Sequence, residues 1–233
     1  MIDVVTPSVR NDQLDMVKKC LDRQTFKDFT WHIVGPVDRA TVKEPEKREG
    51  DYYNLNKAWN AAYRQAKGRL IVSIVDGLWF PPDTLEHLLN HYLMNNKACV
   101  TCIGHQYDRV ENGKPEHMVW RDPRARTDQG SFYEVPHTEM ELCIASFPRQ
   151  AVLDVGGVDE EFDKFAALSE KEMMARMYKA GYKTYISQTI EYRAIQHPRL
   201  STTWDEHYQK GWPYYEQCMK DIASGKRLKL AFL

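Results

Sequence analysis

Two residues that follow apolar runs have the chemistry of a metal and phosphate site. Asp76 directly follows the run 70–75 and precedes Gly77, and in an open α/β sheet ligands bind beyond the carboxyl ends of the strands. His197 follows a second strand-like run, and an aspartate with a histidine suits Mn²⁺ or Mg²⁺ bridged to phosphate oxygens. Each has an ordinary alternative, since Asp-Gly is a common turn and a lone histidine is more often a surface or core residue. The hypothesis is a metal site formed by Asp76 and His197.

An acidic segment at 169–172, Ser-Glu-Lys-Glu, is the third chemical feature. Its spacing predicts a capping box, in which the Ser169 hydroxyl accepts a hydrogen bond from the Glu172 N–H and the Glu172 carboxylate accepts one from the Ser169 N–H. Glu172 then has a structural role. Glu170 lies in the first turn, where the helix dipole favours the ionised form that accepts a proton near neutral pH. Glu170 is therefore the candidate general base, and a solvated first-turn glutamate is the alternative.

Other catalytic signatures do not occur in the sequence. It contains no G-x-x-x-x-G-K-[ST], G-x-G-x-x-G or G-x-S-x-G, which weakens the P-loop, dinucleotide-binding and α/β-hydrolase interpretations. Cys99 and Cys102 have the spacing of a metal or redox pair, but within a strand they point to opposite faces. Five cysteines in a chain of this length predict free thiols in a reducing compartment.

The composition predicts a folded protein without a general affinity for polyanions. A chain of 233 residues that is 42% hydrophobic can bury a sizeable core. Lys plus Arg is 32 and Asp plus Glu is 33, so the net charge of −1 favours neither nucleic acid nor an anionic membrane. No signal peptide and no apolar run of the ~20 residues that span a bilayer is found, so we expect a cytoplasmic protein. Only the tail 225–233 mixes basic and apolar residues; it is either a loosely packed terminus or a peripheral membrane contact.

The first hundred residues alternate between strand-like and helix-like segments. The run 70–75 is apolar on both faces, which is typical of a central strand in a covered sheet. The alternation predicts a mostly parallel α/β sheet. Apolar β-branched runs and helical apolar spacing place strands at 2–6, 31–34, 70–75 and 98–103, and helices at about 14–21, 54–67 and 84–92.

The second half of the chain has a different character. Residues 104–140 are polar and aromatic with little periodicity, which indicates long loops that carry Arg121, Arg124 and Arg126. No repeat and no Gly/Ser/Pro linker divides the chain, so one domain is expected. Further segments follow as strands at 142–147, 182–186 and 190–195, a helix at about 170–180 and a helical C-terminus.

Five segments resemble, in the right order, the motifs of the family 2 type of GT-A glycosyltransferase. They are 2–10 for the opening strand with its Pro-Thr-Tyr-Asn turn, 20–25 for S-x-x-x-Q-T, 56–76 with 82–86 for the R-N-x-G to L-D run, 147–162 for R-R to G-G-F-D-E-x-F, and 169–183 for E-D-x-D-L-x-x-R to G-Y-K. Each match is loose, and their order across the chain makes the resemblance specific.

Three positions depart from the family pattern. The metal motif Asp-x-Asp reads Asp76-Gly77-Leu78 and lacks its second carboxylate. The Glu-Asp base motif reads Ser169-Glu170, which retains a carboxylate that is one methylene longer. The acidic pair at the end of the second strand is replaced by Asp38 in a shifted register, which weakens the expected recognition of uracil.

The resemblance implies a GT-A-type, Rossmann-like single α/β domain over 1–233. Residues 1–103 would be the nucleotide-sugar-binding half, 104–200 the acceptor and catalytic half, and 201–233 a helical tail. The implied activity is an inverting hexosyl or pentosyl transfer from a nucleotide-diphosphate sugar, a UDP-sugar being favoured, to a hydroxyl of a saccharide acceptor. Glu170 would be the base with Glu172 as the rival carboxylate, and Mn²⁺ or Mg²⁺ would lie at Asp76 and His197. The implied substrate-binding residues are Pro7, Ser8, Arg10, Asp38, Asn60, Trp79 and Arg149.

Two other functions stay open at the level of sequence. The missing second aspartate favours a catalytically impaired module that only binds nucleotide or sugar, whereas the carboxylate at 170 opposes it. An enzyme that glycosylates modified bases in DNA is suggested only by the arginines at 121, 124 and 126, and the net charge near zero counts against it.

Overall fold

The computed structural model describes residues 1–42, 54–126, 128–165, 168–195 and 204–231. The first half of the chain alternates strands and helices, as its apolar periodicity predicts. Its elements are β1 (Ile2–Pro7), α1 (Asn11–Asp22), β2 (Phe29–Val34), α2 (Leu55–Gln65), β3 (Leu70–Ile74), β4 (Leu78–Trp79) and α3 (Thr84–Met94). The second half contains β5 (Ala98–Glu111), β6 (Lys114–Trp120), β7 (Phe132–Val135), η1 (His137–Glu139), β8 (Ile144–Pro148), α4 (Arg149–Val155), η2 (Glu160–Lys164), α5 (Ser169–Lys179), β9 (Lys183–Ile195) and α6 (Trp204–Ala223).

Within the described residues the strands form one mixed sheet that is mostly parallel along its central path. The order is β2-β1-β3-β8-β5-β9-β4, with β6 added to β5 and β7 added to β9. Five of the seven strands on this path run in one direction, namely β1, β2, β3, β5 and β9. The pairs β1·β2, β1·β3 and β5·β9 are parallel, and β8 lies antiparallel between β3 and β5. The chain is therefore a single α/β domain, as predicted.

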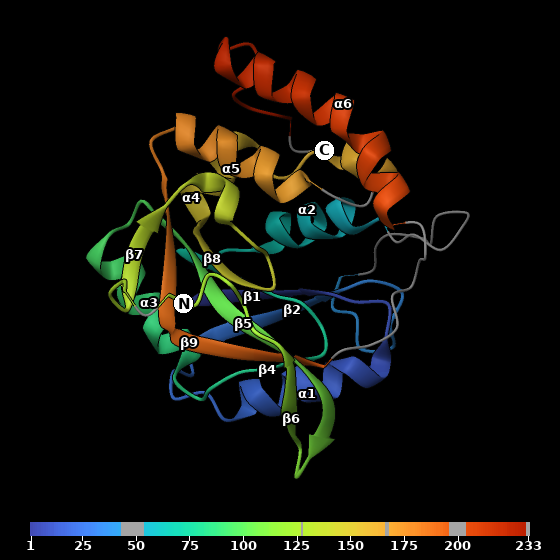
Figure 1. Cartoon of the computed structure of the whole chain (residues 1–233), viewed down its shortest axis with the longest axis vertical. Helices are drawn as coiled ribbons and strands as arrows, with labels where there is room; N and C mark the ends of the chain where they lie inside the picture. Colours follow the sequence, from blue (N-terminus) through green and yellow to red (C-terminus); the bar gives the residue numbers. More distant parts are fainter. Residues whose placement is uncertain (43–53, 127, 166–167, 196–203, 232–233) are drawn as a thin grey trace.

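Helices cover both faces of this sheet (Figure 1). On one face α2, α4 and α5 pack against alternate strand residues such as Val5, Ile71 and Phe147. On the other face α1 and α3 pack against Val4 and Val72, among others. All five residues of β3 are buried between β1 and β8, so the prediction of a central strand at 70–75 is confirmed.

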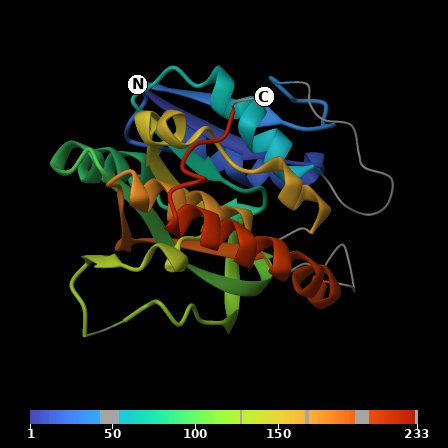
Figure 2. The ribbon, with the colours of Figure 1, turned by 90° about the horizontal axis from the view of Figure 1, so that it is seen from above.

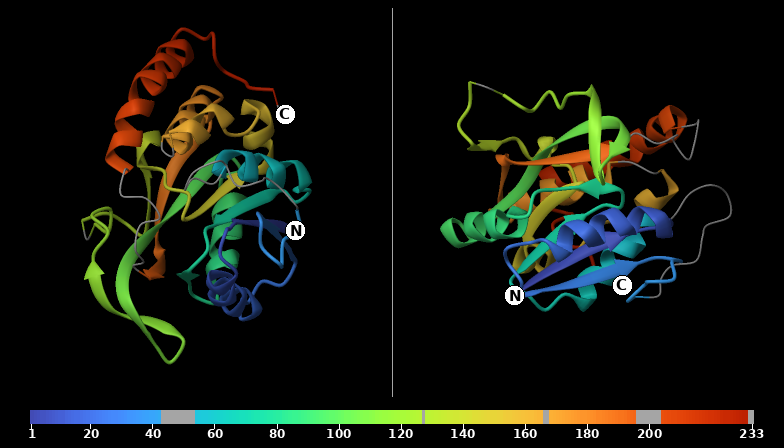
Figure 3. Two further views of the ribbon diagram at one scale, coloured as in Figure 1. Left: turned by 90° about the vertical axis from the view of Figure 1, so that its right-hand side faces the viewer. Right: turned by 90° about the horizontal axis from the view of Figure 1, so that it is seen from below.

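The prediction of long loops over 104–140 is wrong. β5 continues to Glu111 and forms with β6 a hairpin that projects from the domain (Figure 3), and β7 pairs with β9. The turn residues Asn112 and Gly113 both have positive φ, at 52° and 74°, which is the requirement of the Asn-Gly hairpin turn. Residues 108–111 of β5 and 117–120 of β6 are exposed on both faces, so these strands lack the apolar alternation by which strands are recognised.

The last helix and the tail form an outer layer. Seen from above, α6 lies outermost, and the chain beyond it returns toward the body of the domain (Figure 2). Tyr215 and Cys218 of α6 pack on Phe162 and Leu168. The Leu230 N–H donates to the Val155 carbonyl, so the described part of the tail is packed against the end of α4 rather than loose.

Candidate active site

Asp76 lies beyond β3 and is held by two residues that follow β1. The Ser8 hydroxyl donates to Asp76 Oδ2 at 2.7 Å, and Arg10 Nη2 donates to Oδ1 at 2.6 Å. Arg10 Nε also reaches Oδ2 at 3.4 Å. Because β1 and β3 are parallel neighbours, their carboxyl ends meet at one edge, and the structure brings these three residues into contact there.

Asp38 lies at the same edge, beside the start of α1. Asn11 Nδ2 donates to Asp38 Oδ2 at 3.1 Å, and the Asp38 N–H donates to Asn11 Oδ1 at 3.0 Å. Pro7 is buried at the end of β1, in register with Val34 of β2. The loop after β2 is thereby fixed next to Ser8 and Arg10.

Glu170 lies in the first turn of α5, near the start of β8. The Val75 N–H, next to Asp76, donates to the Cys143 carbonyl at the start of β8. Burial is the main cause that raises the pKa of the Cys143 thiol to about 11, and the charge of Glu170 is among the smaller contributors, so Glu170 lies near Cys143. The Glu170 side chain is half-buried, and loss of its hydration raises the pKa of its carboxyl, with a further increase from the charge of Glu141. The expectation that the helix dipole dominates the pKa of Glu170 is thus wrong in sign.

A cluster of charged residues around Arg124 was not predicted from the sequence. This buried side chain donates to Asp122 Oδ2 at 2.6 Å and to Glu141 Oε2 at 2.9 Å, and it also binds the carbonyls of Cys102 and Glu139. Asp122 in turn accepts from the Gly104 N–H of β5. Arg124 is therefore a structural connector that presents Glu141 near Glu170, and it is not an exposed cation for nucleic acid. The spacing Asp122-x-Arg124 was the available signal.

Tyr192 of β9 forms part of the same wall. A Cβ atom at Gly104 would lie 2.0 Å from the Tyr192 ring, so only glycine permits the close approach of this ring to β5. Burial raises the pKa of the Tyr192 hydroxyl well above its usual value, and this hydroxyl lies against Cys143. The Cys143 thiol and the Tyr192 hydroxyl are consequently uncharged at physiological pH.

The predicted capping box at the start of α5 does not form. Leu168 is the N-cap residue, with φ at 75°, and no side chain caps the helix. Glu172 is fully buried and accepts from Arg176 Nη2 at 2.7 Å and from Arg227 Nε at 2.8 Å. Two guanidinium groups compete for the carboxylate more strongly than a neutral backbone N–H does, so Glu172 turns into the protein.

Two of the predicted binding residues have partners away from Asp76. Arg149 follows β8, which runs antiparallel to β3, and its Nε donates to the Ala66 carbonyl at the opposite edge of the sheet. The Trp79 ring is surrounded by cations, with Lys114 Nζ at 4.8 Å and the Arg193 guanidinium at 5.4 Å from its centroid. The structure does not bring Arg149 to the candidate site. His197 lies outside the described residues.

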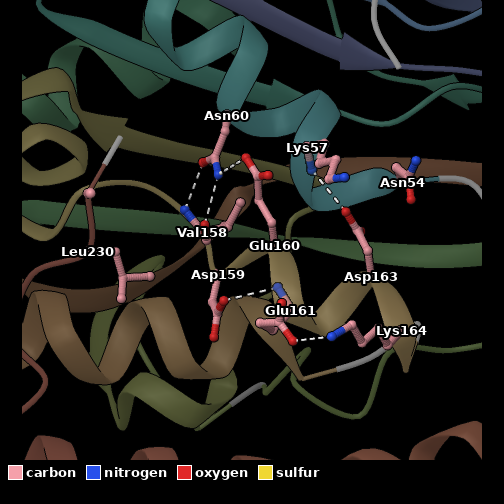
Figure 4. A pocket seen from close by; sticks show the side chains of 11 residues that line it. Asn54, Lys57, Asn60, Val158, Asp159, Glu160, Glu161, Asp163, Lys164 and Leu230 are labelled. Carbon is pink, nitrogen blue, oxygen red and sulfur yellow. Dashed lines mark hydrogen bonds and ion pairs between the residues drawn. The ribbon is translucent and has the colours of Figure 1, made fainter. Parts of the chain in front are cut away.

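A cavity of about 470 Å³ lies between the start of α2, the 158–164 segment and the C-terminal tail (Figure 4). Its polar groups bind one another. Asn60 accepts from the Val158 N–H and donates to the Val158 carbonyl and to Glu160, while Asp163 accepts from the N–H groups of Asn56 and Lys57. Burial raises the pKa of Asp163 to about 6. The structure thus places Asn60 in a contact that joins α2 to η2.

Among the residues that the structure describes, those around Asp76 do not fit a divalent cation. Both carboxylate oxygens already accept hydrogen bonds from a cationic or hydroxyl donor. Leu78, at the position of the second aspartate of the motif, is buried in the core at 3% exposure. Among the described residues no group of three His, Cys, Asp or Glu side chains is placed to hold a metal ion.

Comparisons with known proteins identify the class. The family model described as "Glycosyl transferase family 2" matches residues 22–154, more than half of the chain. The chain therefore belongs to glycosyl transferase family 2. The matched segment includes Asp76 but ends before Glu170. No curated protein matches the sequence.

Solved structures show the same GT-A fold. A crystal structure of GalNAc-T7 with UDP, GalNAc and Mn²⁺ superposes with a TM-score of 0.69 at 12% identity, covering 98% of this chain and 54% of that one. S. aureus TarS 1-349 in complex with UDP gives a TM-score of 0.58 at 12% identity, covering 95% of this chain and 70% of that one. The chain thus spans about half the length of the GalNAc-T7 structure. Across the part of the chain that the structure describes, no helix is long and apolar enough to cross a membrane.

Proposed function

We propose that this glycosyltransferase moves a sugar from a nucleotide-diphosphate sugar to an acceptor hydroxyl with inversion, with Glu170 as the general base. The proposal is supported by the Ser8–Arg10–Asp76 cluster at the carboxyl edge of the sheet, and by the effect of the Glu170 charge on Cys143, whose carbonyl accepts from the Val75 N–H next to Asp76. A UDP-sugar is the favoured donor, supported by the UDP in both structural neighbours. A saccharide is the favoured acceptor, and the region 104–200 is the acceptor half.

The proposed reaction is one displacement at the anomeric carbon. Glu170 removes the proton of the acceptor hydroxyl while its oxygen forms the new bond to carbon, and the bond to the diphosphate oxygen breaks with its electron pair on the leaving nucleotide. A raised pKa brings the Glu170 carboxylate nearer to the working pH, which favours proton transfer by a general base. Glu141 is close enough for its charge to contribute to this increase.

The donor would lie over the ends of β1 and β3. Ser8, Arg10 and Asp76 surround the place of the diphosphate, and Asp38 with Pro7 lines the side of the nucleoside. The sequence-based prediction of Mn²⁺ or Mg²⁺ at Asp76 and His197 is supported by the Mn²⁺ in the GalNAc-T7 structure and opposed by the contacts of Asp76. No step above depends on the metal. All five cysteines are free, which supports a reducing compartment such as the cytoplasm.

The test is a panel of nucleotide sugars and saccharide acceptors with the wild type and Glu170→Gln. We expect the variant to retain donor affinity and melting temperature while turnover falls by about 10²–10⁴-fold, the usual effect of a lost general base. Glu134→Gln is the matched control, because Glu134 is exposed on β7 and paired with Lys183. In the wild type, the acid limb of the rate profile should lie above the pKa of an ordinary glutamate.

The same experiment separates the transferase from a binding module. Donor binding without turnover for any acceptor of the panel favours a module that only binds nucleotide sugar, an alternative supported by the missing second aspartate. Normal turnover in Glu170→Gln refutes Glu170 as the base.

A further inference from the structure

We propose that the Arg10 guanidinium, oriented by Asp76, supplies the positive charge that binds the donor diphosphate, so that donor binding needs no divalent cation. The inference rests on the proposed function, because it concerns the same donor. It follows from the contacts of three residues, Ser8, Arg10 and Asp76.

Asp76 is engaged on both carboxylate oxygens. Oδ1 accepts from Arg10 Nη2 at 2.6 Å, and Oδ2 accepts from the Ser8 hydroxyl at 2.7 Å and from Arg10 Nε at 3.4 Å. Its side chain is 10% exposed. A divalent cation on either oxygen would stand beside the guanidinium and be repelled by it, so Arg10 and a metal compete for the same carboxylate.

The loop after Asp76 provides no second carboxylate. Gly77 has φ at 73°, and its N–H donates to the Gln13 carbonyl of α1. The chain then enters β4, where Leu78 pairs with Ala194 of β9 and is buried in the core. The loop is therefore fixed so that residue 78 faces the core instead of the donor.

Arg10 retains donors for a phosphate. A guanidinium has five N–H groups, and Asp76 takes the one on Nε and one on Nη2, which leaves three. Its side chain is 24% exposed, so these donors are accessible at the edge of the sheet. The planar fork binds phosphate oxygens in a bidentate manner, and the carboxylate behind it fixes its orientation. Asp76 is thus a positioning residue rather than a metal ligand.

The experiment is calorimetric titration of the full chain with UDP, once with excess EDTA and once with MnCl₂. We expect the same Kd within about twofold in both buffers. Arg10→Gln should weaken UDP binding about tenfold or more, the effect of a lost charge-assisted contact of roughly 1.5–3 kcal/mol, and MnCl₂ should not restore it. Arg39→Gln is the matched control, since Arg39 makes a similar pair with Asp15 on the outside of α1.

Two more variants distinguish the roles and guard against misfolding. Arg10→Lys keeps the charge without the fork, and it should bind UDP with intermediate affinity. Asp76→Asn weakens the hydrogen bonds that orient Arg10, so it should change UDP binding by the same factor in EDTA and in MnCl₂, whereas at a metal site it would remove only the binding that MnCl₂ adds. Melting temperatures of all variants verify folding.

Three results overturn the inference. The first is UDP binding that requires MnCl₂, and the second is unchanged binding in a folded Arg10→Gln variant; both leave the proposed transferase intact. The third is absence of UDP binding by the wild type in both buffers, which also removes the favoured UDP-sugar donor of the proposed function.

Discussion

Replacing Glu172 by Gln tests the structural interpretation most directly, because the capping-box and ion-network interpretations predict opposite results. In a capping box Gln replaces Glu at little cost. In the structure, Glu172 is fully buried and accepts three hydrogen bonds, from Arg176 Nε and Nη2 and from Arg227 Nε, at 2.9, 2.7 and 2.8 Å. A neutral amide has one acceptor oxygen and directs its NH₂ group at guanidinium donors. Arg176 then remains buried without its counter-charge.

The magnitude follows from the burial of the pair. Removing one partner of a buried ion pair costs about 3–5 kcal/mol, out of a total stability of about 5–15 kcal/mol. Arg227 keeps Asp159 as a second partner, which limits the loss to that range. For a chain of this size each kcal/mol lowers the melting temperature by about 2–4 °C, so we expect a decrease of roughly 6–20 °C.

The assay is thermal and urea unfolding of Glu172→Gln beside Glu170→Gln. Glu170→Gln is the matched control, because Glu170 lies in the same helix turn but is only half-buried and does not bind Arg176 or Arg227 in the way that Glu172 does. Because the folded state raises the pKa of Glu170, its ionised form opposes folding above the pKa of the unfolded chain, and Glu170→Gln should melt at or slightly above the wild type at neutral pH. A Glu172→Gln variant that melts within about 2 °C of the wild type would refute the ion network.

Two further predictions concern the sheet. Ile74→Asp places an unpaired carboxylate in the fully buried β3, which costs several kcal/mol, so we expect no soluble folded protein; normal yield and melting would contradict the central strand. Asp3 accepts from His32 and from the N–H groups of Lys67 and Gly68; burial alone would raise the pKa of Asp3, but these bonds together lower it. Asp3 therefore stabilises the fold above its unfolded pKa of about 4, and this contribution disappears as the pH falls further. Urea midpoints from pH 7 to pH 2 should decrease less steeply in Asp3→Asn, and parallel curves would show that Asp3 contributes nothing.

Most of the fold could be predicted from apolar patterning. Buried residues recur with helical or strand periodicity in the first hundred residues, because each element there contacts the core on a fixed face. The β5–β6 hairpin was not predicted because residues 108–111 and 117–120 are exposed on both faces, although Asn112-Gly113 is a strong turn signal. The alternation of apolar residues identifies a strand only where one face of the strand is buried, because only a buried face requires apolar side chains.

The candidate site was predictable only where one short segment contains the chemistry. The segment 7–10 and Asp76 follow strands that were predicted to belong to one mostly parallel sheet, and the carboxyl ends of parallel strands lie at one edge, so their contact was foreseeable. Arg124 with Glu141, and Arg227 with Glu172, are joined by contacts between segments far apart in the sequence. A capping motif is a local preference worth about 1 kcal/mol, and it gives way to a buried pair of charges.

The two glutamates at the start of α5 have different roles because of helix geometry. Residues two apart on an α-helix are separated by about 200° around its axis, so a helix that directs Glu172 into the core presents Glu170 on the other side. Glu172 binds Arg176, whose guanidinium also donates to the carbonyls of Val155 and Gly157 at the end of α4. Through Arg227 the same carboxylate binds the tail that follows α6. The first turn of α5 is thereby tied to two other elements, and a base that must stand within hydrogen-bond reach of an acceptor hydroxyl benefits from such fixation. We therefore expect the buried network to fix the position of Glu170, the proposed base.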